Sequence, residues 1–167
     1  MAIALNRSLR FIVLSGVFAG TVATLAQLLL WWLTAVPLPD VLYRDTRLTA
    51  AILLPRSILA PESLFQAPGM LALLTATAIH FTLSMLYSAI FFYLTEYSKA
   101  AGRRPLMAGL VFGLALYGVN MYGFTLLMPW FGLVRDCITI AAHAVFGLCL
   151  GLAVRANTRR KCPLLPI

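Results

Sequence analysis

The residues best suited to chemistry in this sequence are its two histidines, His80 and His143, which both lie inside long apolar stretches. An ionisable side chain in a membrane-crossing segment is rare and usually marks a functional site. Gln27 and Asn120 carry amide groups in similarly apolar surroundings, where a polar group needs a hydrogen-bond partner. We therefore expect these four side chains to share one polar pocket.

Three roles are compatible with the two histidines. They can be neutral, hydrogen-bonded and purely structural. They can sense or relay protons through a water-filled outer pocket, because a free imidazole exchanges its proton near pH 6.5. They can also ligate a b-type haem between two helices, the only metal site that they would make. Nothing else in the sequence indicates a porphyrin site, so we expect no cofactor and keep haem as the lesser alternative.

Signatures of catalysis are missing from the sequence. No carboxylate lies inside an apolar stretch, and there is no HExxH, CxxC or phosphate-binding glycine loop. Cys137, Cys149 and Cys162 are odd in number and indicate no disulfide framework. We predict a protein that is not an enzyme.

Composition places these residues in a membrane protein. The 167 residues are 62% hydrophobic and only 11% charged, whereas about a quarter of a soluble domain is charged. A spanning helix needs about 20 mostly apolar residues. We predict one all-α membrane domain over residues 1–167, a four-helix bundle with spans at 11–36, 69–95, 105–131 and 135–156.

The basic residues predict the orientation of these spans. Cytoplasmic segments retain Lys and Arg, and placing both chain ends inside gives nine basic residues on the inner side and four on the outer side. Trp31, Trp32 and Trp130 fall at outer ends of spans, where indole rings favour the headgroup level. We expect a multi-pass protein of a bacterial inner membrane with its partners in the bilayer, and no nucleic acid.

The outer connection, residues 37–68, contains five prolines that interrupt any continuous helix. Residues 46–54 (TRLTAAILL) predict either a short surface helix with Asp45 as its N-cap or a loop packed over the bundle. The three acidic residues of this connection share it with three arginines, so we expect salt bridges there in preference to a cation site.

Matching residues recur at constant shifts, which predicts two pseudo-repeated helical hairpins. At a shift of 93, Gly16, Gly20, Thr24 and Gln27 correspond to Gly109, Gly113, Tyr117 and Asn120. At a shift of 63, His80, Ser84 and Ser88 correspond to His143, Gly147 and Gly151. The repeat depends mainly on the two histidines, because glycine patterns are common in membrane helices.

Three GxxxG pairs predict close helix contacts, within the chain in preference to between copies of it. They are Gly16 with Gly20, Gly109 with Gly113, and Gly147 with Gly151. The glycines fall in the inner half of the predicted spans and the four polar residues in the outer half. We therefore expect close packing near the cytoplasm and a polar pocket that faces outward.

Several segments together resemble the YagU family of small bacterial inner-membrane proteins. They are residues 16–39 (GVFAGTVATLAQLLLWWLTAVPLP), 80–84 (HFTLS), 108–113 (AGLVFG) and 142–147 (AHAVFG). The resemblance implies a link to acid resistance, and it brings no established activity or catalytic residue. We expect a pocket that responds to protons or holds a small ligand. The alternative is an accessory subunit of a larger respiratory, photosynthetic or transport complex.

Overall fold

The computed structural model describes residues 2–98 and 104–161, and within these ranges it contains helices and no strand. The four longest are α1 (Ala2–Leu33), α3 (Met70–Tyr97), α5 (Pro105–Gly118) and α6 (Cys137–Lys161). With the turns that extend α5 to Leu126, all four are long and apolar enough to cross a membrane. The predicted all-α class with four spans is confirmed, and the chain is an integral membrane protein.

Some predictions concern residues outside the described set. Lys99, Arg103 and Cys162 lie outside it, as do the side chains of Arg7, Arg159, Arg160 and Lys161. Among the described cysteines, Cys149 is buried, Cys137 is exposed, and neither forms a disulfide.

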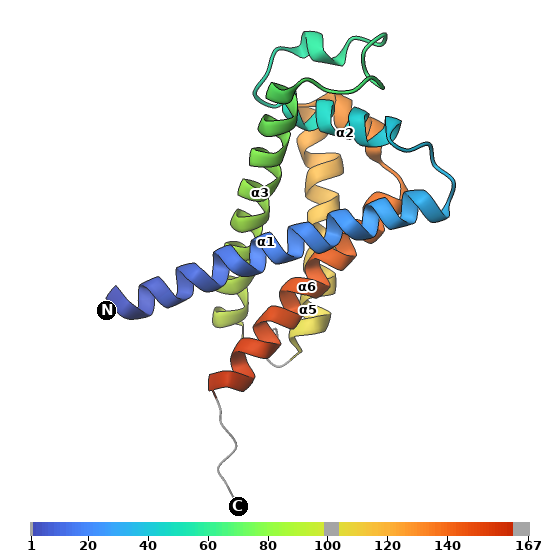
Figure 1. Cartoon of the computed structure of the whole chain (residues 1–167). Coiled ribbons are helices and arrows are strands. Elements are labelled where there is room, and N and C mark those ends of the chain that lie inside the picture. Colours follow the sequence, from blue (N-terminus) through green and yellow to red (C-terminus); the bar gives the residue numbers. More distant parts are fainter. Residues whose placement is uncertain (1, 99–103, 162–167) are drawn as a thin grey trace, which may run out of the picture.

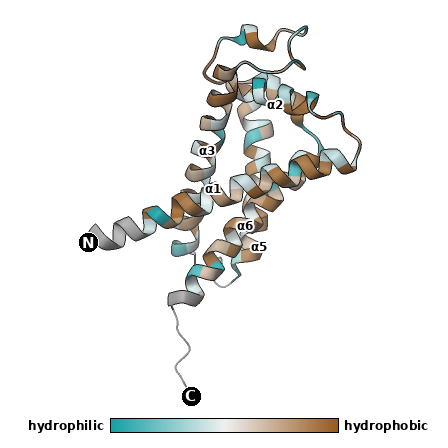
Figure 2. Ribbon diagram, viewed as in Figure 1, coloured by the Kyte–Doolittle hydropathy of each residue, from teal (hydrophilic) through white to brown (hydrophobic). Residues whose placement is uncertain are grey.

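The four spanning helices pack in the order α3, α1, α6, α5. Helix α1 runs obliquely across α3 and α6 and contacts both, while α5 packs most extensively against α6 (Figure 1). By contrast, α3 meets α5 and α6 at few residues. Hydrophobic residues predominate along the long helices, and α2 is more polar (Figure 2). Helix α1 therefore connects α3 to α6 by packing against both, whereas α3 and α5 pack loosely against each other.

Helix α1 ends at Leu33, three residues before the predicted end of the first span. The N–H of Ala35 donates to the carbonyl of Trp32 at 3.3 Å, and that of Val36 to the carbonyl of Trp31 at 2.9 Å. These two bonds form a Schellman motif. Ala35 takes the left-handed conformation at its centre, with φ 54°, where glycine avoids a steric penalty.

Replacing Ala35 with glycine is expected to stabilise the protein by about 1 kcal/mol, because the left-handed conformation costs an L-residue about 1–2 kcal/mol. Thermal unfolding in detergent, followed as a rise in midpoint temperature, measures the effect. An unchanged or lower midpoint in Ala35→Gly would contradict it.

The third span does not remain α-helical to residue 131. After Gly118 the chain forms a π-helical turn (Val119–Gly123), then 3-10 turns at Phe124–Leu126 and Pro129–Val134. A π turn inserts one extra residue into the helical repeat and often occurs at functional sites. This turn contains Asn120, one of the predicted pocket residues.

The fourth helix begins at Cys137, two residues after the predicted start of its span. Oδ1 of Asp136 accepts a hydrogen bond from the N–H of Thr139 at 2.7 Å. A carboxylate at this position caps the N-terminus of a helix and compensates its free N–H groups. The cap therefore determines where α6 starts.

The outer connection forms a helix that starts earlier than predicted, α2 (Asp40–Ala50). The assignment of Asp45 as an N-cap was wrong, because Asp45 lies in the middle of this helix. Leu48 and Ala50 are buried, α2 packs against α3, and Nε1 of Trp130 donates to the carbonyl of Leu48 at 2.9 Å. The segment therefore packs over the bundle as a helix, so each of the two alternatives was half right.

The arginines of this region mostly bind groups other than carboxylates. Within the described residues one salt bridge is found, between Nε of Arg44 and Oδ1 of Asp45 at 2.8 Å. Arg47 donates to the carbonyls of Ile58 and Ala67, and the guanidinium of Arg56 lies 5.0 Å from the Trp130 ring centre. The predicted salt bridging is confirmed for Asp45 alone.

Candidate functional site

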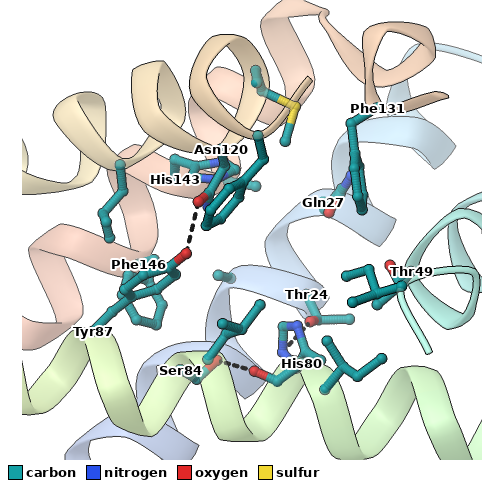
Figure 3. Close-up of a pocket in the computed structure, with 18 of the residues that line it drawn as sticks. Thr24, Gln27, Thr49, His80, Ser84, Tyr87, Asn120, Phe131, His143 and Phe146 are labelled. Carbon is teal, nitrogen blue, oxygen red and sulfur yellow. Dashed lines mark hydrogen bonds between the residues drawn. The ribbon is translucent and has the colours of Figure 1, made fainter. Parts of the chain in front are cut away.

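A cavity of about 340 Å³ lies between α3, α1 and the second hairpin, beneath α2, and all four predicted polar residues line it. In Figure 3, His80 lies on the α3 side of the cavity and Asn120 and His143 on the opposite side, with Gln27 between them in this view. An adjoining cavity of about 420 Å³ shares Gln27, His80 and His143 and extends under α2 to Asp45. The helices thus bring Asp45 to the same place as the residues identified from sequence.

The wall formed by the second hairpin is an ordered chain of hydrogen bonds. Nδ1 of His143 lies 2.8 Å from the carbonyl of Thr139, so it must carry the proton, and Nε2 is then an acceptor. The amide nitrogen of Asn120 donates to this Nε2 at 3.2 Å, and Oδ1 of Asn120 accepts from the Tyr87 hydroxyl at 2.7 Å. This chain connects α3, the π turn and α6, and it satisfies neutral His143 fully.

The wall formed by the first hairpin holds its histidine in the other tautomer. The Thr24 hydroxyl donates to the carbonyl of Gly20 at 3.0 Å and lies 3.4 Å from Nε2 of His80. Since the hydroxyl proton is already used, Nε2 of His80 donates to Thr24 and its Nδ1 is left as an acceptor. No hydrogen bond joins the two imidazoles in the described part of the chain.

Gln27 and Asn120 differ in their partners although the repeat makes them equivalent. The Asn120 amide bonds to His143, a residue of the same predicted pocket. Gln27 is half-buried, and its side chain makes no hydrogen bond within the described residues. Tyr87, which was not predicted from the sequence, donates its hydroxyl proton to Oδ1 of Asn120. Its place one helical turn after Ser84 is the only sequence feature that could have predicted a role in the cavity.

The six predicted glycines lie at contacts between helices. A Cβ atom on Gly20 would lie 2.6 Å from Oγ of Ser84 and 3.1 Å from Nε2 of His80. At the equivalent contact, a Cβ atom on Gly113 would collide with the carbonyl of His143. Gly16 meets the backbone of Met85, and the remaining three glycines, Gly109, Gly147 and Gly151, meet backbone across the α5–α6 contact.

Equivalent residues of the two hairpins therefore meet equivalent partners. Gly20 faces the side chains of Ser84 and His80, and Gly113 faces the backbone carbonyl of His143, so the same residue pair meets in both hairpins through different atoms. Thr24 adjoins His80, and its counterpart Tyr117 packs edge-on against His143 with ring centres 5.6 Å apart. In the second hairpin the Tyr117 ring occupies the position that corresponds to Thr24, the residue that accepts the proton of His80 in the first hairpin. Its presence gives a physical reason for the different tautomer of His143.

Asp45 is the acidic group of the adjoining cavity. Burial under α2 raises the pKa of Asp45 from 3.8 to about 6, an effect that Arg44 reduces and Asp136 reinforces. Its side chain retains 21% exposure. Asp45 therefore changes charge under mildly acidic conditions and has access to solvent.

The hydroxyl of Thr139 is the one buried side-chain polar atom among the described residues that has no hydrogen-bond partner. Thr139 lines the adjoining cavity and is only 6% exposed. An unsatisfied buried hydroxyl costs roughly 1–3 kcal/mol. We expect Thr139→Val, which keeps the shape of the side chain, to raise the unfolding free energy by about 1 kcal/mol.

Denaturant or thermal unfolding of Thr139→Val beside Thr139→Ser checks this prediction. Serine keeps the hydroxyl and should not give the gain. A valine variant that is less stable than the original protein would show that the hydroxyl has a partner in solution.

The site does not fit a haem. Both nitrogens of His143 are engaged within the protein, and Nε2 of His80 is held by Thr24. Ligation by both Nε2 atoms would break contacts on both walls. The described residues also contain no cluster of three His, Cys, Asp or Glu side chains suited to a metal ion.

Comparisons with known proteins add no further constraint on function. No family model, no curated protein and no solved structure matches the chain. The feature of this chain that bears most directly on function is the cavity shared by Asp45, His80 and His143.

Proposed function

We propose that this protein is a non-enzymatic, proton-responsive protein of a bacterial inner membrane, whose cavity under α2 rearranges in mild acid. The observation that supports the proposal is that Asp45, His80 and His143 line a single cavity. Asp45 changes charge in mild acid, since its pKa is about 6, and imidazole is the side-chain type most often used as a proton switch. The YagU resemblance points in the same direction.

The hydrogen bonds around His143 can adopt two arrangements, one for the neutral and one for the protonated imidazole. When Nε2 of His143 gains a proton it becomes a donor and can no longer accept from the Asn120 amide nitrogen. The amide must then turn so that its oxygen accepts, and the Tyr87 hydroxyl loses its acceptor. Because α3 otherwise meets α5 and α6 at few residues, this exchange alters how α3 is held.

The charged groups around the cavity favour a response in the same pH range. Arg44 pairs with Asp45, and Asp136 at the start of α6 adds negative charge nearby. Protonation of Asp45 releases Arg44 from its partner, and protonation of an imidazole adds positive charge beside it. Because burial raises the pKa of Asp45, protonation of this carboxyl favours the packing of α2 on the bundle as the pH falls, whereas a positive charge on an imidazole of the same cavity opposes it. The arrangement of the cavity therefore depends on pH through two effects of opposite sign.

The packing on the opposite side favours sensing over transport. The α5–α6 contact has no space for even a methyl group on Gly109, Gly113 or Gly147. These backbone contacts leave no passage between α5 and α6. The cavity therefore suits a receptor for protons that reach it from the α2 side.

Intrinsic tryptophan fluorescence tests the proposal, because two indoles report on the region. Trp31 lines the cavity and is 4% exposed, and Trp130 holds α2 through the carbonyl of Leu48. Titration of the protein in nanodiscs from pH 8 to pH 4 should give a reversible transition with a midpoint near pH 6. Asp45→Asn and His143→Gln should each shift or reduce it.

Glu62→Gln is the matched control, because Glu62 is an exposed carboxyl of the same connection. It should leave the midpoint and the amplitude unchanged. If the triple variant Asp45→Asn, His80→Gln and His143→Gln kept the original transition, the response would come from elsewhere and the proposal would be wrong.

A further inference from the structure

We infer that the cavity between α3 and the second hairpin binds an uncharged lipophilic molecule with a hydroxyl head, an alcohol or a phenol, taken up from the bilayer. The volume of about 340 Å³ lies in the range of small-molecule sites. The cavity is only partly enclosed, and it separates α3 from α5, two spanning helices with few mutual contacts. A molecule dissolved in the membrane can therefore reach it between these helices.

The lining selects against charged ligands. Within residues 2–98 and 104–161, no Asp, Glu, Lys or Arg side chain lines this cavity, whose ionisable groups are the two histidines and the phenol of Tyr87. Most of the wall is apolar and rich in aromatic and sulfur-containing side chains, namely Tyr87, Met121, Phe124, Met128, Phe131 and Phe146. A charge placed here would lose its hydration without a partner, whereas a flat or extended hydrocarbon body would pack against these rings.

The free hydrogen-bonding groups lie outside the wall formed by the second hairpin. Nδ1 of His80 is an acceptor that has no hydrogen-bond partner among the described residues, and it is not a fully enclosed atom. The Gln27 amide and the Thr49 hydroxyl also line the cavity without a side-chain hydrogen bond to the described residues. These three side chains come from α3, α1 and α2, and Figure 3 shows His80 and Thr49 across the cavity from Tyr87, Asn120 and His143, with Gln27 between the two groups in this view.

This distribution determines the head group. A hydroxyl has a proton to donate to Nδ1 of His80 and lone pairs that can accept a proton from the amide of Gln27. An ether or a ketone has no proton to donate to His80. A carboxylate also has no proton to donate, and this cavity offers no Lys or Arg to pair with its negative charge. The site therefore fits a single uncharged hydroxyl on an apolar body.

The test compares 4-octylphenol with its methyl ether, 4-octylanisole, which differs by the hydroxyl proton. Binding is measured at pH 7.5 as the rise in unfolding temperature in detergent, with a thiol-reactive dye that labels buried Cys149 on unfolding. Cys137 and Cys162 are first replaced with serine to lower the background. The phenol should bind roughly threefold to tenfold more tightly than the ether.

Two pairs of proteins show where the probe binds. Leu83→Trp fills the cavity and should abolish stabilisation by both probes, whereas Leu86→Trp, on the same helix but 51% exposed, should leave it intact. His80→Phe should remove the difference between phenol and ether, and the outward-facing Thr82→Val should retain it.

Equal binding of phenol and ether by the original protein, or no binding of either, overturns the inference. So does full binding in Leu83→Trp, or a phenol preference that survives in His80→Phe. Gln27→Leu gives a second measurement if His80→Phe does not fold, and it should also weaken the preference. All ligand binding is measured at one pH, so a negative result in this test does not contradict the proposed proton response. A negative result in the pH titration likewise does not contradict ligand binding.

Discussion

Substitution of Gly147 with alanine is expected to destabilise the bundle by about 3 kcal/mol, at the upper end of the usual cost of overpacking. The added Cβ would lie 2.8 Å from the backbone nitrogen of Gly113 and 2.9 Å from the carbonyl carbon of Gly109. Backbone atoms cannot rotate away as a side chain can, so α5 and α6 must move apart. They form the most extensive helix contact of the protein, which is lost over several turns when they separate.

Gly118→Ala is the matched control on α5. A Cβ at Gly118 would meet nothing within 4 Å, so the substitution should stabilise the helix by about 0.5–1 kcal/mol, the usual difference between the two residues. Apparent unfolding temperatures of both variants in the same detergent provide the measurement. Effects of equal sign at Gly118 and Gly147 would show that helix propensity, and not the contact, determines the result.

Replacement of Asp45 with asparagine is expected to stabilise the protein by about 3 kcal/mol at pH 7.5 and to have no effect near pH 3.5. The pKa of Asp45 rises from 3.8 to about 6 on folding, so the folded protein retains a proton that the unfolded chain releases. Each unit of difference corresponds to about 1.36 kcal/mol. The original protein therefore loses stability as the pH rises from about 4 to about 6, and the asparagine variant does not.

Unfolding temperatures of Asp45→Asn and the original protein across pH 3.5–8 measure this dependence. The two curves should coincide in acid and separate between pH 4 and pH 6. Asp40→Asn, a change at the exposed first residue of the same helix, should not separate from the original protein in this way. If the unfolding temperatures of Asp45→Asn and the original protein differed by the same amount at every pH, the stability of the protein would not depend on protonation of Asp45.

The helical content and the spans were predictable because the bilayer imposes a length and an apolar composition on each segment. The pairs at shifts of 93 and 63 match Gly20 and His80 with Gly113 and His143, and each glycine lies against its histidine, by the side chain in the first pair and by the backbone in the second. Rarity made the polar residues of the cavity recognisable, because few amides or imidazoles occur inside spans.

The helix boundaries and α2 were less predictable. The Schellman motif at Ala35 and the π turn around Asn120 depend on local backbone bonds that hydropathy does not report. Helix α2 is positioned by the bond from Trp130 to Leu48, two residues far apart in the chain. Nothing in the residues near Asp45 indicates that its carboxyl is buried.

Composition, charge placement and repetition alone determined the class of this protein, the number of its spans and the residues on which its chemistry would depend. Only the tertiary structure decided that Asp45 joins the histidines, that the two imidazoles hold different tautomers, and that one wall of the cavity is saturated while the other is free. The physical reason is that lipid and protein neighbours are equally apolar, so hydropathy along a span does not indicate which face meets which helix. The space between α3 and α5 follows from those pairings.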